Sequence, residues 1–149
     1  MSANPLDEIV SEWEKDAKLD PSNIKSQSLE TPHLHAKYIR ILSTWKQKKT
    51  KKVIELNELK RVKTRWMNGE LSLQECKERG WEQWQFNKPL RTQIPEILSG
   101  DSECNAISSQ LEYIETVIYV VENIIKMINQ RDFTISNYLK QVVFENGGR

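Results

Sequence analysis

A strict helical repeat near the C-terminus constrains the fold of this 149-residue chain more than any other feature. Large apolar residues recur there at alternating intervals of three and four, as Leu111, Ile114, Ile118, Val121, Ile125 and Ile128. That spacing places them on one face of an α-helix, in the manner of a heptad seam. A second apolar stripe lies beside the first and contains Tyr113, Val117, Val120, Ile124 and Met127. A helix with two adjacent apolar seams needs more than one packing partner.

This double seam predicts packing between subunits, because one further long helix in the same chain could cover only part of it. We therefore expect a homo-oligomer with an interface formed by Leu111, Ile114, Val117, Ile118, Val121, Ile124, Ile125 and Ile128. An ordinary core within one chain is the alternative that the same pattern allows. In a cyclic assembly several weak binding sites would act together, and overall affinity would rise without new contacts.

The remaining patterns predict an all-α fold in a single domain. Asn4 and Asp20 each precede a proline, which is an N-cap signal followed by a favoured first helical residue. Thr31-Pro32 repeats the signal, so we expect a long helix that is broken or kinked near Pro32 and runs to about Trp66. The expected parts are N-terminal helices over 1–66, an irregular connection over 67–107, and C-terminal oligomerisation helices over 108–145.

Two short helices are expected outside the long ones. Ser72 and Glu75 stand at the spacing of a capping box, which predicts a helix start within the connection. A final helix is predicted from about Thr134 to Phe144, with its apolar residues facing inward: Ile135, Tyr138, Leu139, Val142 and Val143.

The charge of the chain is strongly uneven, although its formal net charge is only +1. The stretch from Lys37 to Arg65 holds eleven of the twenty-two Lys and Arg residues and only two acids, Glu55 and Glu58. Its net charge is therefore +9, and the rest of the chain is acidic. A concentrated basic block of this kind indicates a polyanionic partner, most often a nucleic-acid backbone.

The register of this block sharpens the interpretation. An apolar seam continues from Leu34 to Trp66, but Lys49, Lys52 and Lys63 occupy seam positions. A buried lysine is costly unless it is paired, so we expect this part of the seam to stay open to solvent or phosphate. The alternative is a solvated helix whose lysines cover apolar neighbours and pair with acids elsewhere. The predicted nucleic-acid contacts are Lys46, Lys48, Lys49, Lys51, Lys52, Lys60, Arg61, Lys63, Arg65 and Trp66.

Aromatic residues follow the basic block and alternate with further cations. Trp66, Trp81, Trp84 and Phe86 are interleaved with Lys77, Arg79, Lys88 and Arg91. Unpaired bases stack on aromatic rings beside cationic grooves when single strands are bound without sequence preference. Trp66 is the expected base contact. For Trp81 and Trp84 we favour simple packing of the connection.

Enzymatic and metal-dependent functions find no support in the sequence. His33 and His35 would point to different faces of a helix, and Cys76 has no nearby His to activate its thiol. Motifs for a metalloprotease, a phosphate-binding loop or a nucleophile elbow are missing. We expect no catalytic residues, no metal and no cofactor. Neither a transmembrane helix nor a signal peptide is expected, and the two cysteines fit a reducing cytoplasm.

Several segments together resemble the UvsY family, the recombination mediator proteins of T-even-like bacteriophages. The opening Leu6-Asp7-Glu8-Ile9 is similar to the first helix of the family, and Lys63-x-Arg65 with Trp66 is similar to the end of its basic helix. The C-terminal signature is represented by Leu111-Glu112-Tyr113, Arg131-Asp132-Phe133-Thr134-Ile135 and Phe144-Glu145-Asn146-Gly147. The resemblance spans most of the chain and is weakest in the middle. The insert with Trp81 and Trp84 departs from the shortest members.

The resemblance implies a non-enzymatic protein that binds single-stranded DNA as a hexameric or heptameric homo-oligomer in the cytoplasm of the infected bacterial host. It implies contacts with a RecA-like recombinase and a single-strand-binding protein, and nucleation of a presynaptic filament. It assigns DNA binding to Lys63 and Arg65, and oligomerisation to the C-terminal helices. The competing hypothesis is a helical oligomeric adaptor that docks on acidic protein surfaces, with nucleic-acid binding incidental.

Overall fold

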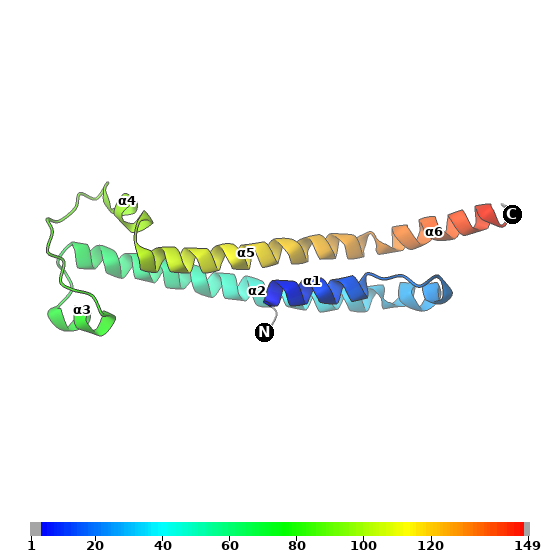
Figure 1. The fold of residues 1–149 in the computed structure, drawn as a ribbon, viewed down its shortest axis with the longest axis horizontal. Coiled ribbons are helices and arrows are strands. Elements are labelled where there is room, and N and C mark those ends of the chain that lie inside the picture. Colours follow the sequence, from blue (N-terminus) through cyan, green and yellow to red (C-terminus); the bar gives the residue numbers. More distant parts are fainter. Residues whose placement is uncertain (1–3, 148–149) are drawn as a thin grey trace. The chain divides into compact units, whose positions relative to one another are not determined.

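The computed structural model describes residues 4–147, and every regular element in that range is a helix (Figure 1). The predicted all-α class is confirmed. The elements, in chain order, are α1 (Pro5–Asp16), a short 3-10 helix (Pro21–Asn23), α2 (Ile24–Met67), α3 (Leu73–Arg79), α4 (Ile94–Ser99), α5 (Ser102–Asn129) and α6 (Arg131–Glu145).

Three predicted helix starts carry the caps that the sequence indicates. The side chain of Asn4 accepts a hydrogen bond from the backbone N–H of Asp7 at 2.8 Å, and Asp20 accepts one from Ser22 at 3.0 Å. Ser72 accepts one from the N–H of Glu75 at 3.1 Å. Each bond satisfies a backbone donor that has no partner inside its own helix.

The expected break near Pro32 does not occur, since α2 is continuous from Ile24 to Met67 with Pro32 inside it. Proline removes one hydrogen bond from the helical ladder, and the turns on both sides nevertheless stay helical. The helix ends within one residue of the predicted Trp66.

Other boundaries differ from the prediction. The segment 67–107 contains the unpredicted helix α4, and α5 begins at Ser102 rather than near 108. The reason is local, because the Asp101 carboxylate accepts a hydrogen bond from the N–H of Cys104 at 2.9 Å and caps the helix there. Helix α6 begins at Arg131, three residues before the predicted start.

The chain divides into two compact units. The first runs up to Lys46 and resumes at Glu115, and the second is Gln47–Ile114. In the first unit α1 lies along the N-terminal part of α2 (Figure 1). Trp13 meets Tyr38 edge to face at 5.5 Å, and the hydroxyl of Tyr38 donates to Asp16 at 2.9 Å. Burial, followed by this bond, raises the pKa of Tyr38 far above its ordinary value.

A buried arginine joins the start of α6 to the same unit. Arg131 is 6% exposed, and its guanidinium donates to the backbone carbonyls of Asp16 and Gln27 at 3.1 and 3.2 Å. The rest of α6 is less covered than predicted. Ile135 is buried, but Tyr138, Leu139 and Val143 are exposed, so the prediction that all of them face inward is wrong within this chain. Only the stripe of α6 that contains Ile135 is covered by packing.

In the second unit α3, α4 and the segments beside them lie near the C-terminal end of α2 and the start of α5 (Figure 1). One core cluster contains Leu56, Leu59, Met67, Leu98 and Cys104, and a smaller one contains Val62, Leu71 and Cys76. Trp66 and Trp81 pack against both clusters. The aromatic residues after the basic block therefore help to build the core of this unit.

Candidate nucleic-acid interface

The predicted contacts fall into different environments. In the second unit Lys48, Lys51, Lys60 and Arg61 are exposed, whereas Lys49, Lys52 and Arg65 are partly buried. Within residues 4–147 neither Lys51 nor Lys60 forms an ion pair with an acid. Lys46 is exposed and belongs to the first unit, where its ammonium lies 4.0 Å from Glu122.

Three of these cations are paired with nearby acids. Lys52 lies 3.1 Å from Glu55, and Arg61 makes a two-pronged contact with Glu58 at 2.6 and 3.0 Å. Hydrogen bonding from Arg61 lowers the pKa of Glu58, so this pair stays ionised. The side chain of Arg65 lies 3.7 Å from Glu70. The only two acids in the basic block are thus held close to two of its cations.

Lys63 is the exception in the segment, because it is only 4% exposed. Its ammonium lies 2.6 Å from Asp101 and 3.1 Å from Glu103. It also sits 4.7 Å from the ring centre of Trp81 and 5.7 Å from that of Trp66, within cation–π range. The expectation that this seam lysine stays open to solvent or phosphate is wrong. Acids some forty residues away neutralise it.

The electrostatics of Lys63 favour a permanently charged pair. Burial lowers the pKa of Lys63, but the hydrogen bonds to Asp101 and Glu103 outweigh that effect and the net pKa is raised. Burial likewise raises the pKa of Asp101, and hydrogen bonds from Lys63 and the Cys104 backbone bring it below its ordinary value. Both groups are therefore charged at neutral pH. Whether Lys63 contacts DNA stays a prediction.

The tryptophans form a connected cluster beside Lys63. The indole N–H of Trp81 donates to Glu103 at 2.6 Å, that of Trp66 to the carbonyl of Glu82 at 2.8 Å, and that of Trp84 to Asn87 at 3.2 Å. The ring centre of Trp66 lies 5.3 Å from Trp81 and 5.1 Å from Trp84. All three rings are partly exposed. This agrees with the interpretation that Trp81 and Trp84 pack the connection. Trp66 packs in the same cluster.

A hollow of about 360 Å³ lies over these rings. It is lined by one lysine, four aromatic residues and a polar edge: Lys63, Trp66, Trp81, Glu82, Gln83, Trp84, Gln85, Phe86 and Glu103. Phe86 is 76% exposed and meets Trp84 edge to face at 5.1 Å.

The geometry offers binding groups rather than reactive ones. In the described part of the chain no cluster of His, Cys, Asp or Glu could hold a metal ion. Cys76 and Cys104 are both buried, and burial raises the pKa of the Cys104 thiol. Among the described helices none is long and apolar enough to cross a membrane.

Comparison with known proteins agrees with this picture. The family described as "Recombination, repair and ssDNA binding protein UvsY" matches residues 12–148. The chain belongs to the UvsY family. Its fold is similar to the crystal structure of the recombination mediator protein UvsY of bacteriophage T4, with a TM-score of 0.79 at 16% identity over 97% of this chain and all of that one. No curated protein sequence matches the chain.

Family membership confirms the main functional prediction. The protein is a recombination mediator that binds single-stranded DNA, and it is not an enzyme. The cationic helix and the aromatic hollow can therefore be considered as parts of a surface for a single strand.

The predicted oligomerisation residues are largely covered within the chain itself. Seven of them are at most 9% exposed: Ile114, Val117, Ile118, Val121, Ile124, Ile125 and Ile128. The eighth, Leu111, is partly buried against the core of the second unit. A core within one chain accounts for this burial, and the role of these residues between subunits stays a prediction.

Sequence reasoning missed the two acids that hold Lys63. Asp101 and Glu103 flank the first residue of α5, where an N-cap aspartate and a first-turn glutamate are favoured. That local signal could have located the helix start. It could not have paired these acids with a lysine 38 residues earlier, because the pairing depends on how the chain returns along α2.

Proposed function

We propose that this protein binds the phosphates of single-stranded DNA along the exposed cations of α2 within Gln47–Ile114. In this proposal Lys48, Lys51, Lys60, Arg61 and Arg65 make electrostatic contacts, and Lys49 and Lys52 contribute through their exposed portions. The observation that carries the proposal is the exposure of Lys51 and Lys60, two lysines with no acidic partner among the described residues, in a family that binds single strands.

The arrangement suits a flexible single strand. Lys51 and Lys60 are nine positions apart, which corresponds to roughly 14 Å along a helix at about 1.5 Å per residue. At about 3.6 residues per turn they lie on opposite sides of α2, so a strand that meets both must cross the helix. Charges at that separation reach different phosphates, and each neutralised phosphate releases counterions. Binding of this kind is independent of sequence and falls steeply with salt.

A double variant tests this surface. Changing Lys51 and Lys60 together to Ala should flatten the slope of log affinity against log salt by up to about 1.4, at ~0.7 for each phosphate that is no longer neutralised. The matched control changes Lys18 and Lys25 to Ala, which removes the same charge from exposed positions of the first unit. Equal slopes for the two variants would refute the assignment. If the protein bound heparin or an acidic peptide as tightly as it binds single-stranded DNA, the adaptor hypothesis would be favoured instead.

We further propose that the protein helps to load a RecA-like recombinase onto DNA that is covered by single-strand-binding protein. A mediator of this kind must hold the strand while one protein replaces another. Weak, salt-sensitive contacts that are repeated in a homo-oligomer suit that task. Single contacts can break and form again while the oligomer remains bound to the strand. The lag before filament assembly on covered DNA should lengthen in the Lys51 and Lys60 variant. An unchanged lag would show that loading of the recombinase does not depend on Lys51 and Lys60.

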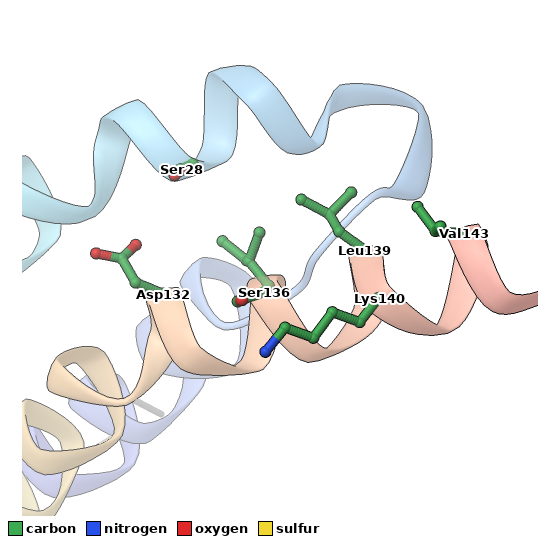
Figure 2. A pocket seen from close by; sticks show the side chains of 7 residues that line it. Ser28, Asp132, Ser136, Leu139, Lys140 and Val143 are labelled. Atoms are coloured by element: carbon green, nitrogen blue, oxygen red, sulfur yellow. The ribbon is translucent and has the colours of Figure 1, made fainter. Parts of the chain in front are cut away.

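The exposed side of α6 supports assembly with further copies. Its apolar side chains include Phe133, Leu139, Val143 and Phe144, which are 70%, 47%, 51% and 81% exposed. A hollow of about 490 Å³ lies between α6 and the part of α2 that carries Ser28, and Leu139 and Val143 project from α6 toward this part of α2 (Figure 2). Several large apolar side chains exposed on one helix indicate a surface that binds another protein.

Native mass measurement tests the assembly. Leu139→Glu with Val143→Glu should give smaller species that remain folded, because both side chains are already exposed in one chain. Ile118→Glu, at a position 9% exposed, should instead disrupt folding and give insoluble chains. An unchanged hexameric or heptameric mass for the α6 variant would exclude this face from the interface.

A further inference from the structure

We propose that the aromatic hollow beside Lys63 accepts an unpaired nucleobase of single-stranded DNA. This inference rests on the proposed function and adds a second kind of contact to it. The cations of α2 would hold the backbone, and the hollow would hold a base by stacking.

The exposed ring of Phe86 provides the first argument. A phenylalanine that is 76% exposed loses the benefit of burial, yet this one stands at the rim of a hollow with three tryptophans. Trp84 supports it edge to face at 5.1 Å. One face of the ring is therefore available for stacking, and base–aromatic stacking is strong enough to matter for affinity.

The hydrogen bonds of the hollow provide the second argument. The indole N–H groups of Trp66, Trp81 and Trp84 all donate to protein oxygens. They fix the rings in place and leave ring faces, rather than indole donors, for a ligand. Every base has a flat π-face, so such a site tolerates any sequence. The side-chain amides of Gln83 and Gln85 line the hollow and make no hydrogen bond with the described residues.

Lys63 is the positioning residue of this site. Its ammonium lies 3.1 Å from Glu103, and Glu103 in turn accepts from the Trp81 indole at 2.6 Å. The chain of contacts ties α2 to α5 and sets the angle of the Trp81 ring. An effect of Lys63 on DNA binding would then arise through the shape of the hollow rather than through a phosphate.

The size of the hollow and the cations near it suit the proposed occupant, while Glu82 and Glu103 place two carboxylates in the lining itself. The guanidinium of Arg79 lies 5.3 Å from the ring centre of Trp81, and Lys77, Lys88 and Arg91 are exposed in the same segment. These cations favour the phosphates on either side of a bound base. A volume of about 360 Å³ is at the small end of ligand sites, as expected for a single base with part of its sugar.

An abasic oligonucleotide separates the two kinds of contact, because it keeps the phosphates and removes the bases. The full-length protein should bind oligothymidine more tightly than an abasic strand of equal length, and oligothymidine should quench tryptophan fluorescence more strongly. Phe86→Ala should weaken oligothymidine binding by between about fivefold and a hundredfold. It should leave abasic binding and the salt slope unchanged, and Phe86→Trp should restore the difference.

Leu90→Ala is the matched control, since Leu90 is 67% exposed in the same segment and does not line the hollow. It should bind both strands as the unaltered protein does. Equal affinity of the unaltered protein for the two strands would overturn the base site and leave the phosphate surface intact. Loss of abasic binding in Phe86→Ala would also overturn it. Failure of the phosphate surface itself would appear only in the Lys51 and Lys60 variant.

Discussion

Lysines at two places in the basic block of α2 act in opposite ways. The side chains of Lys48 and Lys51 are exposed. Twelve residues beyond Lys51, Lys63 is 4% exposed and is bound by two carboxylates. Lys48 and Lys51 present charge to solvent, whereas Lys63 uses its charge to join α2 to the start of α5. A count of basic residues therefore overstates the charge that a DNA strand can meet.

The difference also separates two mechanisms of DNA binding. Removal of an exposed lysine abolishes its counterion release and leaves the fold intact. Removal of the buried lysine leaves Asp101 without its cation and disturbs the rings above it. The same decrease in affinity could follow from either change, so affinity alone cannot distinguish them.

The largest expected effect is on folding. Lys63→Met should lower the free energy of unfolding by about 3 kcal/mol, because breaking a buried ion pair leaves an uncompensated charge. Lys51→Met, at an exposed position, should change it by less than ~0.5 kcal/mol. Urea unfolding followed by circular dichroism measures both. Equal stabilities of the two variants would remove the distinction between the exposed lysines and Lys63.

A smaller effect is expected from pH. The lowered pKa of Asp101 means that its stabilising contribution is present above its ordinary pKa of about 3.8 and is lost as pH falls through the folded value. The raised pKa of Lys63 means that its contribution is present below about 10.5 and is lost as pH rises beyond that value. The stability difference between the unaltered protein and Lys63→Met should therefore be level from about pH 5 to 9 and shrink below pH 4. If the stability difference between the two proteins did not change with pH in the acid range, the ion pair between Lys63 and Asp101 would not be its cause.

The smallest effect concerns an acid in the segment. Glu58→Gln releases Arg61 from its two-pronged contact and removes a charge that repels phosphate. Affinity for oligothymidine at low salt should rise by about two- to threefold, and the gain should disappear at high salt. Glu14→Gln removes an equal charge from an exposed position in the first unit and serves as the control. Weaker binding of Glu58→Gln would show that the pair orders the surface instead of masking it.

Local signals were sufficient to predict much of the fold. The repeat from Leu111 to Ile128 predicted the long helix α5, and the caps at Asn4, Asp20 and Ser72 located three helix starts. The predicted break at Pro32 was wrong, because neighbouring turns sustain α2 across one missing hydrogen bond, and the predicted kink there stays a prediction. Helix α4 was missed, since six residues are too few to show a periodicity.

The candidate site was predictable only in part, because burial depends on distant residues. Charge and spacing identified the exposed lysines of α2, and the aromatic residues were recognised as a group. Lys49, Lys52 and Lys63 share one seam register, and all three were expected to stay open to solvent or phosphate; Lys49 and Lys52 are partly buried, whereas Lys63 is buried. Its true environment depends on Asp101 and Glu103, which approach α2 only when the chain returns through α5. Tertiary pairing of this kind leaves no periodic trace in the sequence.

The most direct test of the contrast between the exposed lysines and the buried Lys63 is the salt dependence of binding to oligothymidine in two variants. Each variant is measured under conditions in which circular dichroism shows that it is folded. We expect the double change of Lys51 and Lys60 to Ala to flatten the slope of log affinity against log salt by up to about 1.4. We expect Lys63→Met to weaken binding with the slope unchanged. A flattened slope for Lys63→Met, together with an unchanged slope for the double variant, would contradict the assignment of phosphate binding to the exposed lysines.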